Sequence, residues 1–254
     1  MDLLPEGDSV SCIVIPSNRL DSAKVKGLRA EADAVGLPVA VHERGLDLSR
    51  DLSPAEAGLC WLYSQIISAR DLSRYSSGIL NMHGGAIPEY RGASVLHWAI
   101  INGEEELGVT WHELVEAVDA GPIWVESRIP ITPDATGADM RRAMLAEGLR
   151  LFPEAWARFR HREGTPRYPD LANGRVWRQR RPSDGSISQG WSERQVRDMV
   201  RALCPPWPPP FIETDQGRAF IESVELTPEP EDVPYVTSEG RTIFMRPRRN
   251  GVSS

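Results

Sequence analysis

An amide and an imidazole stand two residues apart in the stretch GILNMHGG, residues 78–85. The apolar residues before them are typical of a buried strand, and residues i and i+2 of a strand point to the same face. Asn81 and His83 are therefore expected to emerge together at the end of that strand. The amide offers a neutral hydrogen-bond donor, and the imidazole can exchange a proton near neutral pH. An isolated Asn-x-His is more often a turn residue beside a hydrogen-bonded core histidine, so the surrounding sequence must decide.

A carboxylate and two glycines extend this set. Gly84 and Gly85 follow His83 directly, and Asp119 precedes the Gly-Pro turn of the stretch DAGPI. Glycine lets the backbone approach a bound molecule closely, and a carboxylate can orient an imidazole or a water molecule. In an open α/β sheet the carboxyl ends of the strands face the ligand crevice. A strand ending at His83 would aim its polar side chains into such a crevice.

Strands alternating with helices are expected to position these residues. Short apolar runs predict strands at 10–15, 37–42, 58–63 and 78–82, and apolar residues at helical spacing predict a helix over 21–36. A short helix is expected between residues 69 and 77, a further helix over 92–103, then two strands at 107–114 and 121–131. The long helix predicted over 136–164 begins at Thr136 as N-cap, and Pro153 is expected to kink or divide it. The pattern indicates an α/β fold with a mostly parallel sheet covered on both faces.

Composition changes after residue 165. Residues 164–190 are rich in Gly, Pro, Arg, Ser and Asp, an amphipathic helix is expected over 192–203, and the proline-rich run CPPWPPPF ends it. Two short strands are expected at 219–226 and 241–246. We therefore predict a catalytic domain at residues 1–165, then a linker and a small, mostly irregular C-terminal α+β unit at 166–254.

Charge and cysteine content limit the partners and the compartment. The 254-residue chain has a formal net charge of −7, and residues 166–254 hold 13 arginines against 12 acidic residues. Binding to nucleic acid depends largely on neutralised phosphates, so a nucleic-acid partner is not expected. The three widely spaced cysteines predict neither a disulfide framework nor a metal clip. The sequence shows no signal peptide and no membrane span, and it predicts a reduced, cytoplasmic protein without a metal.

The wider motif set resembles a known family. NMHGGAIPEYRG at 81–92, GVTWH at 108–112 and VDAGPI at 118–123 stand in order without a large gap. They resemble the core of the 10-formyltetrahydrofolate-dependent formyltransferases, a family with a Rossmann-like sheet flanked by helices. The C-terminal run through CPPWPPPF is similar to that of sugar-nucleotide N-formyltransferases. Methionyl-tRNA formyltransferase shows the same core motifs.

The resemblance implies roles for individual residues. Asn81 would donate a hydrogen bond to the oxyanion formed during formyl transfer, His83 would act as acid or base, and Asp119 would position His83 and carry the proton. The cosubstrate would be 10-formyltetrahydrofolate, held mostly by backbone groups of two segments: Tyr63, Ser64, Gln65, Ile66 and Ile67, and Ala120, Gly121 and Pro122. Acceptor contacts would come from Gly84, Gly85, Tyr90 and Arg91, with Trp207 either stacking on a base or sugar or packed in the core.

Two departures from the family pattern stand out. Relatives usually carry a Pro-Ser or Tyr-Ser pair where this chain has Gly84 and Gly85. Members also begin with a strand and helix that precede the part seen here, so the first, central strand is expected to be missing from this sequence. Nothing in the sequence gives His112 a chemical step, and we expect it to be structural. The cluster Arg175, Arg178, Arg180 and Arg181 is expected to be a solvated face or to contact a diphosphate.

The acceptor is expected to be the amine of a small molecule, most simply a nucleotide-linked amino sugar, and a homodimer is allowed. Three alternatives stay open. One is formylation of an amino-acid-derived amine in a natural-product pathway, and another is hydrolysis of formyltetrahydrofolate. The third is a folate-binding protein without turnover.

Overall fold

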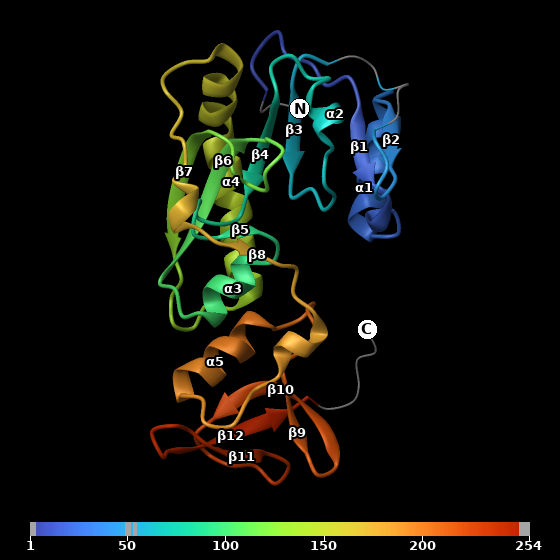
Figure 1. Ribbon diagram of the computed structural model, residues 1–254. Helices are drawn as coiled ribbons and strands as arrows, with labels where there is room; N and C mark the ends of the chain where they lie inside the picture. Colours follow the sequence, from blue (N-terminus) through green and yellow to red (C-terminus); the bar gives the residue numbers. More distant parts are fainter. Residues whose placement is uncertain (1–3, 49–51, 53–54, 249–254) are drawn as a thin grey trace. The chain divides into compact units, whose positions relative to one another are not determined.

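The computed structural model describes residues 4–48, 52 and 55–248 (Figure 1). The chain divides into two compact units, each assembled from three stretches. Unit 1 contains residues 1–83, 109–127 and 147–173, and unit 2 contains residues 84–108, 128–146 and 174–254. The boundary predicted at residue 165 stays a prediction, because grouping by contacts does not test where a domain ends in the sequence.

Unit 1 contains two sheets. A two-stranded parallel sheet pairs β1 (Ile13–Pro16) with β2 (Val39–His42). A four-stranded sheet has the order β3-β4-β6-β7, formed by Gly58–Trp61, Ile79–His83, Glu106–Glu113 and Ile123–Pro130. Strands β3 and β4 are parallel, whereas β4 and β6 are antiparallel, so the predicted mostly parallel sheet is mixed. Among the described residues, β1 and β3 each have a strand partner on one edge only.

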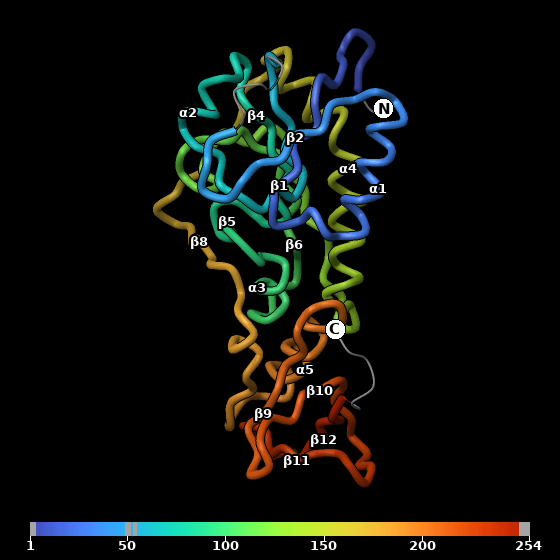
Figure 2. The backbone as a smooth tube through the Cα atoms, turned by 90° about the vertical axis from the view of Figure 1, so that its right-hand side faces the viewer, coloured from blue at the N-terminus to red at the C-terminus, as the bar shows by residue number. Residues whose placement is uncertain are grey.

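Helices cover the strands of unit 1 on both sides. Figure 2 shows α1 (Ala23–Ala34) and α4 (Gly137–His161) on one side of β1, β2 and β4, and α2 (Ala69–Leu72) on the other. The indole Nε1 of Trp111 donates to the carbonyl of Gly148 at 3.0 Å. A Cβ at Gly148 would come within 2.8 Å of Met82, which shows how closely α4 packs on β4. Met82, Trp111 and Phe159 are at most 1% exposed and form this core.

Pro153 does not divide α4, which runs unbroken for 25 residues. Proline removes one backbone N–H and crowds the preceding turn. Burial of one side of the helix compensates for this defect, because Leu151, Phe152, Ala155 and Trp156 are all in the core. Of the two outcomes expected at Pro153, the division of the helix is therefore wrong, and the kink stays a prediction.

Unit 2 places two helices against each other and against a sheet. Helix α3 (Val95–Ile101) packs on α5 (Glu193–Ala202), and α5 packs on β10. The four-stranded antiparallel sheet has the order β11-β12-β10-β9, formed by Val233–Val236, Thr242–Pro247, Gly217–Glu225 and Phe211–Thr214. A short parallel pair joins β5 (Arg91–Gly92) to β8 (Val176–Trp177). The C-terminal part of the chain is thus more regular than the sequence predicted.

Candidate functional site

The pairing of β4 with β6 brings distant polar residues together within unit 1. Asn81 lies opposite His112, and His83 lies opposite Thr110. Because alternate residues share a face, Asn81 and His83 project from the side of β4 on which His112 projects from β6. His83 is 7% exposed and His112 is fully buried. An antiparallel register between two strands therefore sets the spacing of the three side chains.

The hydrogen bonds of His112 determine its tautomer. Its Nδ1 lies 3.1 Å from the carbonyl oxygen of Glu113, which can only accept, so Nδ1 carries the proton. In the neutral ring Nε2 is then an acceptor, and the Nδ2 amide group of Asn81 donates to it at 3.0 Å. This bond fixes which end of the Asn81 side chain is the amide nitrogen. The second N–H of that amide stays available as a donor.

Asp119 lies beside both imidazoles. Its Oδ2 is 3.4 Å from Nδ1 of His83, and its Oδ1 is 3.4 Å from Nε2 of His112. The two rings lie edge to face with centroids 6.1 Å apart. The Asp119 side chain is 12% exposed, so its charge acts in a weakly screened environment. Asn81, His83, His112 and Asp119 thus form one connected group, which we call the polar cluster.

Local backbone geometry holds Asp119 in place. Asp119 has φ +44°, in the left-handed region that few residues other than Gly, Asn and Asp adopt. Gly121 follows, and a Cβ there would lie 1.9 Å from the carbonyl oxygen of Glu113. The amide of Glu113 also donates to the carbonyl of Pro122 at 2.9 Å. The turn predicted to hold the folate is therefore tied directly to β6.

The polar cluster can support transfer of an acyl group. It offers a neutral amide donor for an oxyanion, an imidazole for proton exchange and a carboxylate that orients it. Of these residues, sequence reasoning singled out Asn81, His83 and Asp119 and set His112 aside. The signal for His112 was weak, because its partner Asn81 is 31 residues away and only the strand register joins them.

The segment predicted to bind the folate after β3 is held by contacts with the β1–β2 region. The hydroxyl of Tyr63 donates to Nδ1 of His42 at 2.5 Å, since the other ring nitrogen donates to the carbonyl of Leu46. Burial raises the pKa of the Tyr63 hydroxyl. Ser64 donates to Asn18 at 3.0 Å and Gln65 to Ser17 at 3.4 Å.

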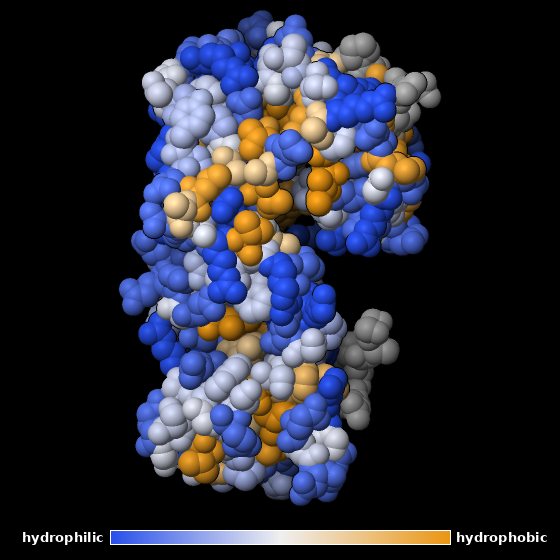
Figure 3. Space-filling model, viewed as in Figure 1, coloured by the Kyte–Doolittle hydropathy of each residue, from blue (hydrophilic) through white to orange (hydrophobic). Residues whose placement is uncertain are grey.

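Apolar side chains are exposed in this segment and in the residues that precede it in the chain. Ile66 is 82% exposed, and Leu46, Leu59 and Leu62 are exposed as well. Figure 3 shows hydrophobic surface over the region of β1 and β3, in the upper half of the view. The assignment of Tyr63–Ile67 to folate binding stays a prediction.

The residues predicted to contact the acceptor belong to unit 2. Gly84 packs against Met144, where a Cβ would lie 2.2 Å from the sulfur, so its small size has a packing reason. The Tyr90 hydroxyl donates to Glu104 at 2.7 Å, and its ring stacks on Trp177 with centroids 5.3 Å apart. Burial raises the pKa of Tyr90 to about 12. Arg91 is 8% exposed, and its Nε has no hydrogen-bond partner among the described residues.

The other two predicted acceptor contacts differ in their surroundings. Gly85 is buried, and a Cβ at Gly108 would press on its carbonyl carbon at 2.7 Å. Trp207 is half-buried, with its ring edge to face against His97 at 4.5 Å between centroids. Trp207 is therefore neither a fully buried core residue nor a free stacking platform.

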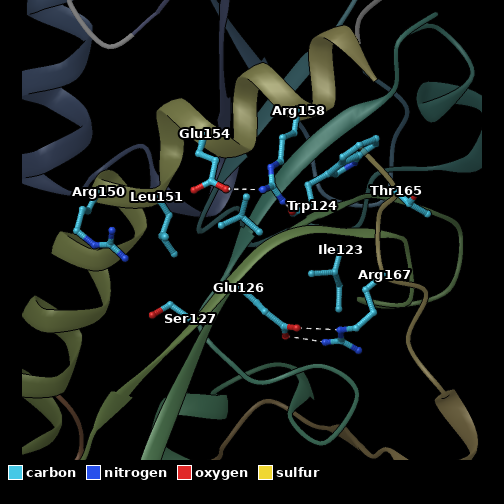
Figure 4. Close-up of a pocket in the computed structure, with 11 residues that line it drawn as sticks. Ile123, Trp124, Glu126, Ser127, Arg150, Leu151, Glu154, Arg158, Thr165 and Arg167 are labelled. Carbon is cyan, nitrogen blue, oxygen red and sulfur yellow. Dashed lines mark hydrogen bonds and ion pairs between the residues drawn. The ribbon is translucent and has the colours of Figure 1, made fainter. Parts of the chain in front are cut away.

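A hollow of about 440 Å³ in unit 1 lies away from all of these residues (Figure 4). It is bounded by β7, by α4 and by Thr165 and Arg167. Its charged side chains already pair with one another, as Glu126 does with Arg167 and Glu154 with Arg158. None of the predicted site residues lines it, and we therefore base the site on the polar cluster.

The described residues offer neither a metal-binding group nor a helix that could span a membrane. No group of three or more His, Cys, Asp or Glu side chains among them could hold a metal ion. Within the same residues, every helix is too short or too polar to cross a membrane.

Comparisons with known proteins find a family model, curated relatives and solved structures that are similar to this chain. A family model described as formyl transferase matches residues 38–156, a range that contains the whole polar cluster. The GDP-perosamine N-formyltransferases of Brucella melitensis biotype 1 and Brucella abortus are 28% identical over 165 residues, which is 65% of this chain. The match spans 63% of the length of these curated relatives.

Solved structures show the same fold. WlaRD, a sugar 3N-formyl transferase crystallised in the presence of dTDP and 5-N-formyl-THF, superposes with a TM-score of 0.70 at 15% identity, covering 95% of this chain and 88% of its own. HypX from Aquifex aeolicus gives a TM-score of 0.64 at 20% identity, over 93% of this chain and 45% of its own. The α/β fold predicted from the sequence is confirmed.

Proposed function

We propose that the chain, whose residues 38–156 match the formyl transferase family model, moves a formyl group from 10-formyltetrahydrofolate to the amine of a small molecule. The observation that carries the proposal is the polar cluster. Within the matched range it joins the amide, two imidazoles and carboxylate at hydrogen-bonding or ion-pairing distance. The relatives are matched over 63% of their length, and their named activity supports the proposal by similarity. The reaction is therefore tested directly.

The proposed reaction exchanges one C–N bond for another. The neutral acceptor amine attacks the formyl carbon, and the carbonyl oxygen gains negative charge. The second N–H of Asn81 donates to that oxygen. The new bond to the acceptor nitrogen is kept, the bond to N10 of the folate breaks, and the proton lost by the amine passes to N10. His83 carries this proton, and Asp119 orients His83 and compensates its transient positive charge.

The acceptor class is the finer part of the proposal. The curated relatives at 28% identity and several of the similar solved structures are sugar N-formyltransferases by name, and we infer a nucleotide-linked amino sugar. The net charge of −7 opposes binding of a polyanion such as tRNA. The named acceptor contacts Gly84, Gly85, Tyr90, Arg91 and Trp207 belong to this proposal, as do the folate contacts. A homodimer and a cytoplasmic location stay predictions, and light scattering tests the first.

A transfer assay tests the proposal. The chain is incubated with 10-formyltetrahydrofolate and a panel of GDP-, UDP- and dTDP-linked amino sugars, and product mass is followed. We expect one acceptor to gain one formyl group. Asn81→Ala and Asp119→Asn should each lower kcat by about 100-fold or more, as removal of an oxyanion donor or a triad carboxylate does elsewhere. Asp134→Asn, an exposed change in unit 2, is the matched control and should be neutral.

Other outcomes would contradict the proposal in distinct ways. Formate release without a formylated acceptor would indicate hydrolysis. Formylation of amino-acid amines alone would keep the reaction and replace the acceptor class. Binding of reduced folate with no turnover on any acceptor would indicate a binding protein without catalysis.

A further inference from the structure

Unit 2 contains buried nitrogen atoms that lack a partner. Among its described residues, Nε2 of His97 and Nε of Arg180 are buried and have no hydrogen-bond partner. Buried polar groups in folded proteins are nearly always hydrogen-bonded, so each unpaired atom calls for an explanation. The two residues come from different segments, since His97 belongs to α3 and Arg180 follows β8.

Positive charge gathers around the same histidine. Burial, followed by the charges of Arg180 and Arg141, lowers the pKa of His97 to about 4. Arg141 comes from a third segment, the first turns of α4. His97 is therefore a neutral imidazole that shares its surroundings with two guanidinium groups.

Acidic side chains do not fully compensate the positive charge of Arg180 and Arg141. The carboxylate that acts on Arg180 is that of Asp184. Both oxygens of Asp184 already accept hydrogen bonds from Arg178, at 2.6 and 2.7 Å. The backbone amide of Arg181 also donates to Asp184. Within the part of the chain that the structure describes, neither Arg141 nor Arg180 forms a salt bridge. Burial lowers the pKa of Arg180, and the charge of Asp184 offsets this effect only in part.

Aromatic rings and a backbone contact fix the positions of these groups. The guanidinium of Arg180 lies 5.7 Å from the ring centroid of Trp98, and the amide of Arg180 donates to Ser94. The ring of Trp207 meets that of His97 edge to face. A Cβ at Gly137 would lie 3.5 Å from Trp207, so the first turn of α4 packs close to the Trp207 ring. The donors are thus held in place before any ligand arrives.

We propose that His97, Arg180 and Arg141 form a binding site for a phosphoryl anion. Phosphate oxygens would accept from Nε of Arg180 and from an N–H at Nε2 of His97, and the anion would supply the missing negative charge. Arginine suits this task because its planar group presents parallel donors. The three residues lie within unit 2, so the site needs no group from unit 1.

Two sources can supply this anion. One is the diphosphate of a nucleotide-linked acceptor, in which case the inference rests on the proposed function and names how the acceptor is recognised. The other is a free phosphate or pyrophosphate ion. Both present the same oxygens, and affinity distinguishes them, because a nucleotide adds a base and sugar that can contact further residues.

Calorimetric titration of the full chain with inorganic phosphate, pyrophosphate and GDP tests the site without a formyl donor. We expect pyrophosphate to bind with a Kd of about 1 mM or tighter. Arg180→Met and Arg141→Met, which keep an apolar stem, should each weaken binding by about 10- to 100-fold, the usual effect of losing a charge-assisted hydrogen bond. Arg142→Met is the matched control. It removes the same charge one residue further along α4, from a side chain that is 72% exposed and pairs with Asp139, and binding should change less than about twofold.

A second measurement does not depend on any variant. The anion neutralises the charges that lower the pKa of His97, so NMR titration of the wild-type imidazole should show a higher pKa with pyrophosphate than with chloride at equal ionic strength. Tighter binding of GDP than of pyrophosphate, lost in Arg180→Met, would support the acceptor as the source. Equal affinities would support a free anion.

The inference is overturned if wild type binds neither pyrophosphate nor GDP at millimolar concentration, or if Arg141→Met and Arg142→Met weaken binding equally. Because no turnover is involved, absent binding with intact formyl transfer removes this inference alone. Intact binding without transfer to any acceptor removes the proposed function alone.

Discussion

At the residue scale, His112 gains a role that its sequence context did not suggest. Its Nδ1–H donates to the carbonyl oxygen of Glu113, and its Nε2 accepts a hydrogen bond from Asn81. The oxyanion donor of the proposed reaction is therefore oriented by a fully buried imidazole. His112 is a positioning residue, because it acts on the reaction through the amide of Asn81.

This role predicts a graded effect of substitution. His112→Phe removes the acceptor for Asn81 and should lower kcat by about 10- to 100-fold, less than complete loss of an oxyanion donor, with little change in KM. His112→Gln offers a side-chain oxygen near the position of Nε2 and should recover a large part of that loss. Steady-state kinetics of both variants, beside their melting temperatures, measure this. Equal losses in the two variants, or a change confined to KM, would contradict the positioning role.

His97 predicts a pH dependence of stability. Its folded pKa of about 4 lies below the ordinary value of 6.5, so the folded state favours the neutral ring and the unfolded state binds more protons between these values. The resulting stabilisation is present above about pH 6.5 and is lost as pH falls towards 4. Arg180 and Arg141 face the ring, and both oppose its protonation.

Urea unfolding at pH 7.5 and pH 5 measures this contribution. Wild type should lose about 2 kcal/mol more stability than His97→Gln over that interval, since glutamine does not titrate. His161→Gln, at the exposed end of α4, is the control and should follow wild type. Parallel losses in wild type and His97→Gln would show that His97 is protonated equally in both states.

At the element scale, local patterns predicted most of the helices and several of the strands. The apolar run before Asn81 forms β4, and the helices predicted over 21–36 and 192–203 are α1 and α5. These signals lie within a few residues of the element they define. The positions of Asn81 and His83 on one face followed from the strand period alone.

Elements that depend on distant partners were harder to predict. The antiparallel pairing of β4 with β6 is non-local, and without it nothing places His112 beside Asn81. Strands β9 and β11 have four residues each and lie at the sheet edges. Pro234 lies within β11, and an edge strand tolerates a residue without an N–H. In α4, the burial of one side of the helix outweighs the destabilising effect of Pro153.

At the scale of the whole molecule, the two compact units do not follow the order of the chain, because each combines segments that are distant in sequence. Unit 2 combines α3 and the first turns of α4 with the C-terminal residues 174–254. Arg194 donates to the carbonyl of Gly103, and Arg201 donates to the carbonyls of Thr132 and Ala135. The C-terminal stretch therefore donates hydrogen bonds to residues that precede the predicted boundary by thirty positions or more.

This grouping predicts how a fragment ending at residue 165 behaves. Such a fragment keeps α3 but loses α5, and it exposes the apolar residues that α3 buries, among them Val95, Leu96 and Ile100. Exposed apolar surface of this kind promotes aggregation. We expect the fragment to bind a hydrophobic dye and to aggregate, and co-expression with residues 166–254 should restore a soluble complex. A monomeric 1–165 fragment that melts cooperatively would show instead that residues 1–165 fold by themselves, and the contacts between α3 and α5 would then be dispensable for stability.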